Sequence, residues 1–267
     1  MDARSKLAIK YDALLRLAAI NTCSGRLPLY IVTEYPKSGG SWVSQLVSDY
    51  FQVPFPRNVP PKFESSVMHG HNLYSPFMKN VICVFRDGRD VMVSAYFHML
   101  FQNERNSPIL VKKTRHEVDF DDYDNVEKNL PAFIKYLFVE QSRITRPFQF
   151  TWPQFYKSWN NTNATIIKYE SLVADGVGEL SSAILHLTGK EADRARVSEI
   201  IEKYSFENQS KRKPGEENTK SFLRSGKPGD WRNKFTREAA LMFDHYAGEE
   251  LIALGYEKDR SWVNDFE

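Results

Sequence analysis

The sequence predicts an α/β protein in which helices flank a central parallel sheet. Its 267 residues, 42% of them hydrophobic, suit one large globular domain. Short β-rich runs alternate with segments of helical spacing, as in strand–helix–strand units. The run Val81–Phe85 is entirely apolar, as in a parallel strand that is covered on both faces. We therefore expect a single domain over residues 1–267.

The N-terminal third shows this alternation first. Apolar residues recur at helical spacing over Leu7–Ile20, which predicts a first helix. A strand is expected at Leu29–Thr33, followed by a glycine-containing turn and a helix over Ser41–Phe51. Val67–Leu73 is a further candidate strand.

Beyond the strand at Val81–Phe85, a helix is expected over Asp87–Phe101. Residues 97–160 have a different composition, with a charged, loop-like stretch over Asn103–Asp124 followed by many aromatic residues. They predict a helical and loop-rich cap on the acceptor side of a site. The remaining expected elements are a strand at Ala164–Tyr169, helices at Val177–Thr188, Glu191–Tyr204 and Glu238–Leu254, and a long loop at 210–230.

Composition excludes several classes of protein. Lys and Arg total 36 against 34 Asp and Glu, and a net charge of +2 does not suggest a generic nucleic-acid or membrane-surface binder. The two cysteines, Cys23 and Cys83, form no disulfide framework or zinc motif. Charged residues interrupt Leu7–Ile20, so it resembles neither a signal peptide nor a transmembrane segment. We expect a soluble, cytoplasmic protein.

The turn after the first strand has the composition of an anion-binding loop. Glycines let backbone N–H groups approach an anion, and the start of the next helix adds partial positive charge. Lys37 supplies a full charge, while Ser38 and Ser41 supply hydroxyl donors. A surface turn with an exposed lysine has similar residue types. Lys37 precedes the glycines, so the loop is not a Walker A motif and an ATPase or kinase is disfavoured.

Three separated blocks give this loop a specific meaning. Tyr-Pro-Lys-Ser-Gly-Gly-Ser-Trp at 35–42 resembles the 5′-phosphosulfate loop of cytosolic-type sulfotransferases, which use 3′-phosphoadenosine 5′-phosphosulfate (PAPS). Residues 84–96 resemble the 3′-phosphate strand and helix of that family, and residues 222–236 its C-terminal Gly-Asp-Trp block. The resemblance runs from about residue 28 to 255. It implies a three-layer P-loop-like fold, transfer of a sulfuryl group from PAPS to a hydroxyl acceptor, and release of 3′-phosphoadenosine 5′-phosphate (PAP).

The resemblance also implies which residues bind the nucleotide. Lys37 would contact the bridging and 5′-phosphate oxygens and stabilise charge on the leaving group. The rest of the loop would complete the cradle. The 3′-phosphate would be held by residues of the second and third blocks, and adenine by aromatic rings. The implied nucleotide ligands are Lys37, Ser38, Gly39, Gly40, Ser41, Trp42, Arg86, Ser94, Tyr169, Phe206, Arg224, Ser225 and Gly226.

A general base must accept the proton of the acceptor hydroxyl. His71 lies where the family pattern Lys-Thr-His places this base, 15 residues before Arg86. Alternation puts His69 and His71 on one face of the strand, so periodicity does not separate them. Glu64 is the other alternative, because carbohydrate-modifying relatives use a glutamate after the first helix.

The sequence departs from the family pattern at a few positions. Gly40 replaces a threonine, His69 occupies a lysine position, and Ser225 replaces a second lysine. The alternative functions are therefore a PAP- or PAPS-binding protein without turnover, or a P-loop kinase. No metal and no nucleic acid are expected. Whether the acceptor is a glycan, a glycolipid or a small molecule remains open, as does the oligomeric state.

Overall fold

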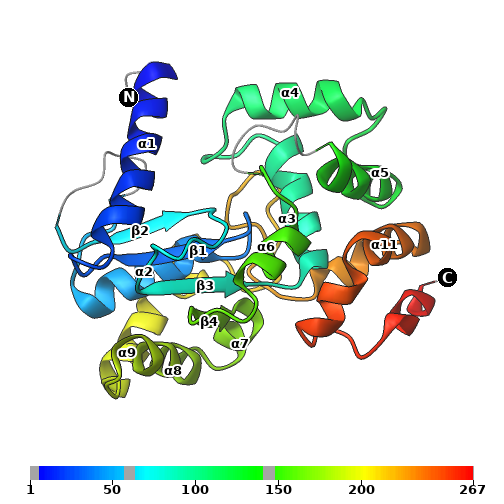
Figure 1. Cartoon of the computed structure of the whole chain (residues 1–267). Helices are drawn as coiled ribbons and strands as arrows, with labels where there is room; N and C mark the ends of the chain where they lie inside the picture. The colour runs from blue at the N-terminus through cyan, green and yellow to red at the C-terminus, as the bar shows by residue number, and fades with distance from the viewer. Residues whose placement is uncertain (1–5, 57–63, 141–147, 267) are drawn as a thin grey trace. The chain divides into compact units, whose positions relative to one another are not determined.

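A computed structural model describes residues 6–56, 64–140 and 148–266 (Figure 1). The chain divides into two compact units, each assembled from separated segments. Unit 1 comprises Met1–Glu34, Gly39–Phe85 and Ser158–Ser205, as far as these ranges are described. Unit 2 likewise comprises Tyr35–Ser38, Arg86–Lys157 and Phe206–Glu267. The loop 35–42 is thus shared, because its first four residues belong to unit 2 and the rest to unit 1.

Unit 1 contains the predicted parallel sheet. Its strands are β1 (Tyr30–Glu34), β2 (Val67–Gly70), β3 (Val81–Phe85) and β4 (Thr165–Lys168), in the order β2-β1-β3-β4. All three pairings are parallel. Every residue of β3 is buried, as its apolar run predicted. The carboxyl ends of β1 and β2 lie together, because Thr33 pairs with Gly70 in the sheet register.

Helices flank this sheet. α2 (Gly40–Phe51), α8 (Gly176–Thr188) and α9 (Arg194–Lys203) contribute to one apolar cluster with the strands, and the short α7 (Tyr169–Ala174) follows β4. α1 (Lys6–Cys23) is drawn on the opposite side of the sheet from α8 and α9 (Figure 1). The predicted fold class, a central parallel sheet flanked by helices, is confirmed.

Unit 2 is mainly helical. Its elements are α3 (Gly88–Leu100), α4 (Pro108–Val118), α5 (Val126–Val139), most of α6 (Trp152–Trp159), α10 (Phe206–Ser210), η2 (Asp230–Asn233), α11 (Arg237–Ala253) and η3 (Arg260–Asp265). Nearly all of α3 is buried, and α5 and α11 pack against each other. The predicted long loop at 210–230 has no helix or strand between the end of α10 and the start of η2.

Two local expectations were wrong. The stretch 103–124 is not a loop, because it contains α4, which begins at the N-cap Ser107 with Pro108 in the first turn. Its charges had suggested a loop, but on α4 they lie on a largely exposed helix in which only Thr114 is buried. The second strand ends at Gly70, so His71 follows the strand. Residues 141–147 of the expected cap lie outside the described residues.

Arg89 shows how the interior of unit 2 tolerates a charge. Its side chain is 1% exposed and forms ion pairs with Asp87 and Glu257. The guanidinium carbon also lies 3.7 Å from the centroid of the Trp231 ring and 4.7 Å from that of Trp262. These partners compensate for burial of the charge, so Arg89 has a structural role.

Within the described residues, no helix combines the length and the apolar character that crossing a bilayer requires.

Candidate functional site

The first half of the predicted phosphate loop, residues 35–38, has an unusual backbone. Lys37 has a φ of 77°, a left-handed conformation that costs a non-glycine residue on the order of 1 kcal/mol or more. Two hydrogen bonds fix this turn. The N–H of Ser38 donates to the carbonyl oxygen of Tyr35 at 3.2 Å, and Nη1 of Arg86 donates to that of Lys37 at 3.3 Å. Strain of this kind is concentrated at functional sites.

A pocket in unit 2 brings together residues from all three sequence blocks. Lys37, Ser94 and Arg224 line it, each from a different block. The Nζ atom of Lys37 lies 3.8 Å from the centroid of the Phe222 ring. Sequence reasoning did not single out the other lining residues, which are Phe97, His98, Asn103, Thr219, Ser221 and Phe222.

Carboxylates hold the two arginines that were predicted to bind phosphate. Arg224 forms ion pairs with Glu217 and, at 2.6 Å, with Asp230, and its side chain is only 7% exposed. Nη2 of Arg86 lies 3.5 Å from Oδ2 of Asp90. Asp90 also accepts hydrogen bonds from the backbone N–H groups of Gly229 and Trp231. Each guanidinium is thereby fixed before any anion binds.

The loop between α10 and η2 is tied down by Arg212. Its Nη1 donates to the carbonyl oxygen of Arg224 at 2.8 Å, and its Nη2 donates to that of Leu223. The Arg212 guanidinium lies 5.2 Å from the Phe206 ring, and Gly226 packs directly against the same ring. These contacts support the backbone that contains Ser225 and Gly226.

The second half of the phosphate loop lies in unit 1. Gly39 has a φ of 101° and precedes α2, so the loop leads directly into a helix N-terminus. The rings of Trp42 and Tyr169 lie 6.0 Å apart in an edge-to-face arrangement. Two of the three aromatic residues predicted to contact adenine therefore touch each other, whereas Phe206 belongs to unit 2.

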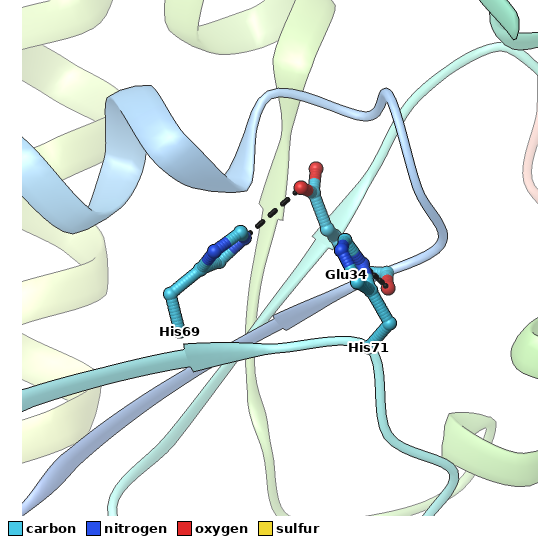
Figure 2. Close-up of side chains that lie close together, drawn as sticks. All are labelled: Glu34, His69 and His71. Atoms are coloured by element: carbon cyan, nitrogen blue, oxygen red, sulfur yellow. Dashed lines mark hydrogen bonds and ion pairs between the residues drawn. The ribbon is translucent and has the colours of Figure 1, made fainter. Parts of the chain in front are cut away.

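Glu34, at the carboxyl end of β1, joins the two candidate histidines in one cluster (Figure 2). Its Oε1 lies 3.0 Å from Nε2 of His69, and its Oε2 accepts a hydrogen bond of 2.6 Å from the N–H of Gly40. Its carbonyl oxygen lies 3.2 Å from Nδ1 of His71. The two imidazole rings are 5.3 Å apart, edge to face. Sequence reasoning missed Glu34, although a carboxylate between a buried strand and a phosphate loop was a usable signal.

Burial alone would raise the pKa of Glu34, whose exposed fraction is only 4%. The hydrogen bond from His69, the charges of His69 and His71, and the N–H of Gly40 outweigh this effect and lower the pKa. Glu34 is therefore a buried carboxylate at neutral pH, and its oxygens act only as hydrogen-bond acceptors.

The lowered pKa predicts how stability depends on pH. Glu34 contributes stability that is fully present above its ordinary pKa of 4.5 and is lost as the pH falls through its lower native pKa. Denaturant unfolding between pH 7 and pH 3 should show this loss in the wild type and a smaller loss in Glu34→Gln. Equal pH dependence in the two proteins would contradict the prediction.

Gly40 provides the space that the Glu34 carboxylate occupies. A Cβ atom at position 40 would lie 2.7 Å from Cδ of Glu34 and 2.9 Å from Nε2 of His69, closer than van der Waals contact allows. The threonine of the family pattern therefore does not fit at position 40 unless this carboxylate and imidazole move.

Gly40→Ala is expected to destabilise the protein by about 1–3 kcal/mol, the usual cost of overpacking. The same change should cost clearly less in a Glu34→Ala background, because the clash with Glu34 is removed, the His69 ring is released from the carboxylate, and alanine is the better helix former. Chemical denaturation of the wild type, both single variants and the double variant measures this coupling. Additive effects would show that the two residues do not compete for space.

The spacing of this cluster also bears on metal binding. Glu34, His69 and His71 each offer a ligand atom within 4.8 Å of the others. Both carboxylate oxygens of Glu34 already accept hydrogen bonds, from Gly40 and His69. The three residues therefore form a hydrogen-bonded cluster whose spacing would also suit a metal ion. The third candidate base, Glu64, is exposed and lies before β2.

Comparison with known proteins identifies the family. The sulfotransferase domain family matches residues 60–255, and the chain belongs to this family. The chain is 24% identical over 269 residues to sulfotransferase 1E1 of Cavia porcellus, covering 83% of this chain and 82% of that protein. It is 23% identical over 273 residues to flavonol 3-sulfotransferase of Flaveria bidentis, covering 84% and 82%.

The fold is similar to that of mouse sulfotransferase SULT7A1, whose crystal structure is a complex with PAP. The TM-score is 0.65 with 17% sequence identity, and the match covers 96% of this chain and 94% of the mouse protein. At this identity the likeness shows the fold, which is the P-loop-like fold that the sequence blocks implied.

Proposed function

We propose that this protein transfers the sulfuryl group of PAPS to a hydroxyl acceptor and releases PAP. The observation that carries the proposal is the pocket in which Lys37, Ser94 and Arg224 meet. These residues lie more than fifty positions apart in the sequence, and the family resemblance assigns each of them to a phosphate of the nucleotide. The PAP complex of mouse SULT7A1 supports the same ligand class.

Two buried polar atoms of the phosphate loop fit an anionic nucleotide. The hydroxyl oxygen of Ser38 and Nε1 of Trp42 are buried without a hydrogen-bond partner among the described residues. Leaving such atoms unsatisfied costs about 1–3 kcal/mol each, which a ligand acceptor would recover. Loop residues 37–42 would hold the 5′ end through groups other than the N–H of Gly40, which already donates to Glu34. Arg86, Ser94, Arg224, Ser225 and Gly226 would hold the 3′-phosphate. Trp42, Tyr169 and Phe206 would contact adenine.

PAPS supplies an activated sulfuryl group whose leaving group is a phosphate oxygen. The protein's contribution is then mainly positioning and charge stabilisation, as in phosphoryl transfer. The ammonium of Lys37 would neutralise charge that develops on the leaving phosphate. The strained backbone of Lys37 and its hydrogen bond from Arg86 support this role by fixing where the side chain begins.

His71 is the proposed general base for the acceptor hydroxyl. A backbone carbonyl oxygen only accepts hydrogen bonds, so Nδ1 of His71 carries the hydrogen that it donates to Glu34. In the neutral ring the lone pair then belongs to Nε2, the atom that would take the proton from the acceptor.

The experiment that tests nucleotide binding is calorimetric titration with PAP. We expect saturable binding to the wild type, weakened about 10–100-fold in Arg224→Gln, the usual value of hydrogen bonds to a charged group. Arg237→Gln is the matched control, because Arg237 is exposed at the start of α11. A wild type without affinity for PAP would overturn the proposal.

The acceptor is a hydroxyl compound in this proposal. A screen of hydroxylated glycans, glycolipids and small molecules with PAPS, followed by mass spectrometry, would detect the product as a sulfate ester. PAP binding without any product would instead favour the second function, a nucleotide-binding protein without turnover.

A further inference from the structure

We propose that Glu34 is a positioning residue that fixes the ring orientation and the tautomer of both histidines, and thereby prepares Nε2 of His71 to accept a proton. The inference rests on the proposed function, in which His71 is the general base. Glu34 acts through two different groups, its carbonyl oxygen and its carboxylate.

The carbonyl oxygen controls His71. It lies 3.2 Å from Nδ1 of His71. Because a backbone carbonyl oxygen can only accept a hydrogen bond, Nδ1 must be the donor. In a neutral imidazole, a hydrogen bond donated by one ring nitrogen leaves the other nitrogen with the lone pair. His71 follows β2 directly, beside the end of β1, so the sheet register brings its ring to this carbonyl group.

The carboxylate controls His69. It is 4% exposed, and Oε1 lies 3.0 Å from Nε2 of His69. An ionised carboxylate only accepts, so Nε2 of His69 carries a hydrogen. The His69 ring in turn packs edge to face against the His71 ring at 5.3 Å, and Figure 2 shows the carboxylate directed toward His69 while His71 lies beside the Glu34 main chain. Fixing His69 therefore restricts His71.

The departures at positions 40 and 69 fit this arrangement. The family pattern that this sequence resembles has threonine and lysine at these positions, whereas this chain has Gly40 and His69. Both contact Glu34, since the N–H of Gly40 donates to Oε2 at 2.6 Å and Nε2 of His69 lies 3.0 Å from Oε1. A Cβ atom at position 40 would collide with the carboxylate. The three residues contact one another, so the presence of the Glu34 carboxylate accounts for both departures from the family pattern.

Histidine NMR tests the inference without nucleotide or acceptor. The chain has six histidines, so long-range ¹H–¹⁵N spectra of histidine-labelled protein are simple to assign with single His→Gln variants. At slightly alkaline pH we expect His71 as the Nδ1–H tautomer and His69 with its hydrogen on Nε2. In Glu34→Ala the His69 signal should shift toward that of an unrestrained ring. Glu199→Gln, an exposed carboxylate on α9, is the control that should leave both signals unchanged.

Kinetics gives the second readout. With PAPS and 4-nitrophenol as a model hydroxyl acceptor, Glu34→Ala should lower kcat at least tenfold, while the Kd for PAP changes by a much smaller factor. Glu34→Gln, which keeps an acceptor oxygen of similar shape, should restore part of kcat. A merely structural role would instead lower stability and leave kcat per folded molecule unchanged.

The outcomes are distinguishable. His71 found as the Nε2–H tautomer, or an unchanged kcat in Glu34→Ala, would overturn the inference even if PAP binds and turnover occurs. Stoichiometric Zn²⁺ binding that Glu34→Ala abolishes would overturn it in favour of a metal site. Absence of PAP binding by the wild type would remove the proposed function, but the tautomers would still be measurable.

Discussion

Lys37→Met is expected to lower PAPS-dependent turnover about 10²–10³-fold, the usual loss when one preorganised electrostatic donor is removed from a transition state. Lys37 lines the same pocket as Ser94 and Arg224, the proposed ligands of the 3′-phosphate. In the proposed mechanism its flexible side chain would turn from there toward the 5′-phosphate, which is the leaving group. Methionine keeps most of the length of the side chain, and the left-handed backbone at position 37 is equally strained with either residue. The loss should therefore fall on the chemical step.

Measuring kcat and the Kd for PAP separately checks this prediction. We expect kcat to fall much more than the affinity for PAP, since other groups also hold the phosphates. Lys190→Met is the matched control, because Lys190 is exposed just beyond the end of α8 and should be replaceable without effect. Turnover of Lys37→Met near that of the control would remove Lys37 from the mechanism.

His71→Ala should reduce turnover at saturating PAPS about 10²–10⁴-fold, the range for loss of a general base. The variant keeps the backbone after β2 and removes only the ring whose Nδ1 donates to Glu34. PAP binding should be close to that of the wild type.

Three variants compared under the same conditions identify the base. We expect the largest loss in His71→Ala, a smaller one in His69→Ala, and almost none in Glu64→Ala, since Glu64 is exposed. A larger loss in His69→Ala would make His69 the base. The third possible ranking, with Glu64→Ala as the most damaged variant, would point to the mechanism of carbohydrate-modifying relatives.

Much of the fold followed from local sequence. The apolar run Val81–Phe85 predicted a strand covered on both faces, and the strand boundaries agree. The charged stretch that contains α4 was misassigned, because a surface helix with few buried residues has almost no apolar periodicity. The start signal Ser107-Pro108 was present but is short compared with the surrounding charge.

The candidate site could be predicted where residues match a motif of the family, as Lys37, Ser94 and Arg224 do. Glu34 belongs to no such motif, and its importance depends on contacts with residues up to 37 positions away. Only the parallel pairing of β1 with β2 brings these groups together. Partners of this kind are set by topology, which the sequence shows only after the strand order is known.

Arg86 and Arg89 lie three positions apart, yet substituting them would abolish activity for unrelated reasons. The buried Arg89 packs against Trp231 and Trp262 and stabilises the fold of unit 2. Arg86 instead donates a hydrogen bond to the backbone of Lys37 in the predicted phosphate loop. A mutational screen scored by product formation alone would rank both as essential and would count Arg89 among the chemical groups. Only a parallel measurement of soluble yield or melting temperature would separate a variant that fails to fold from a folded variant that is inactive.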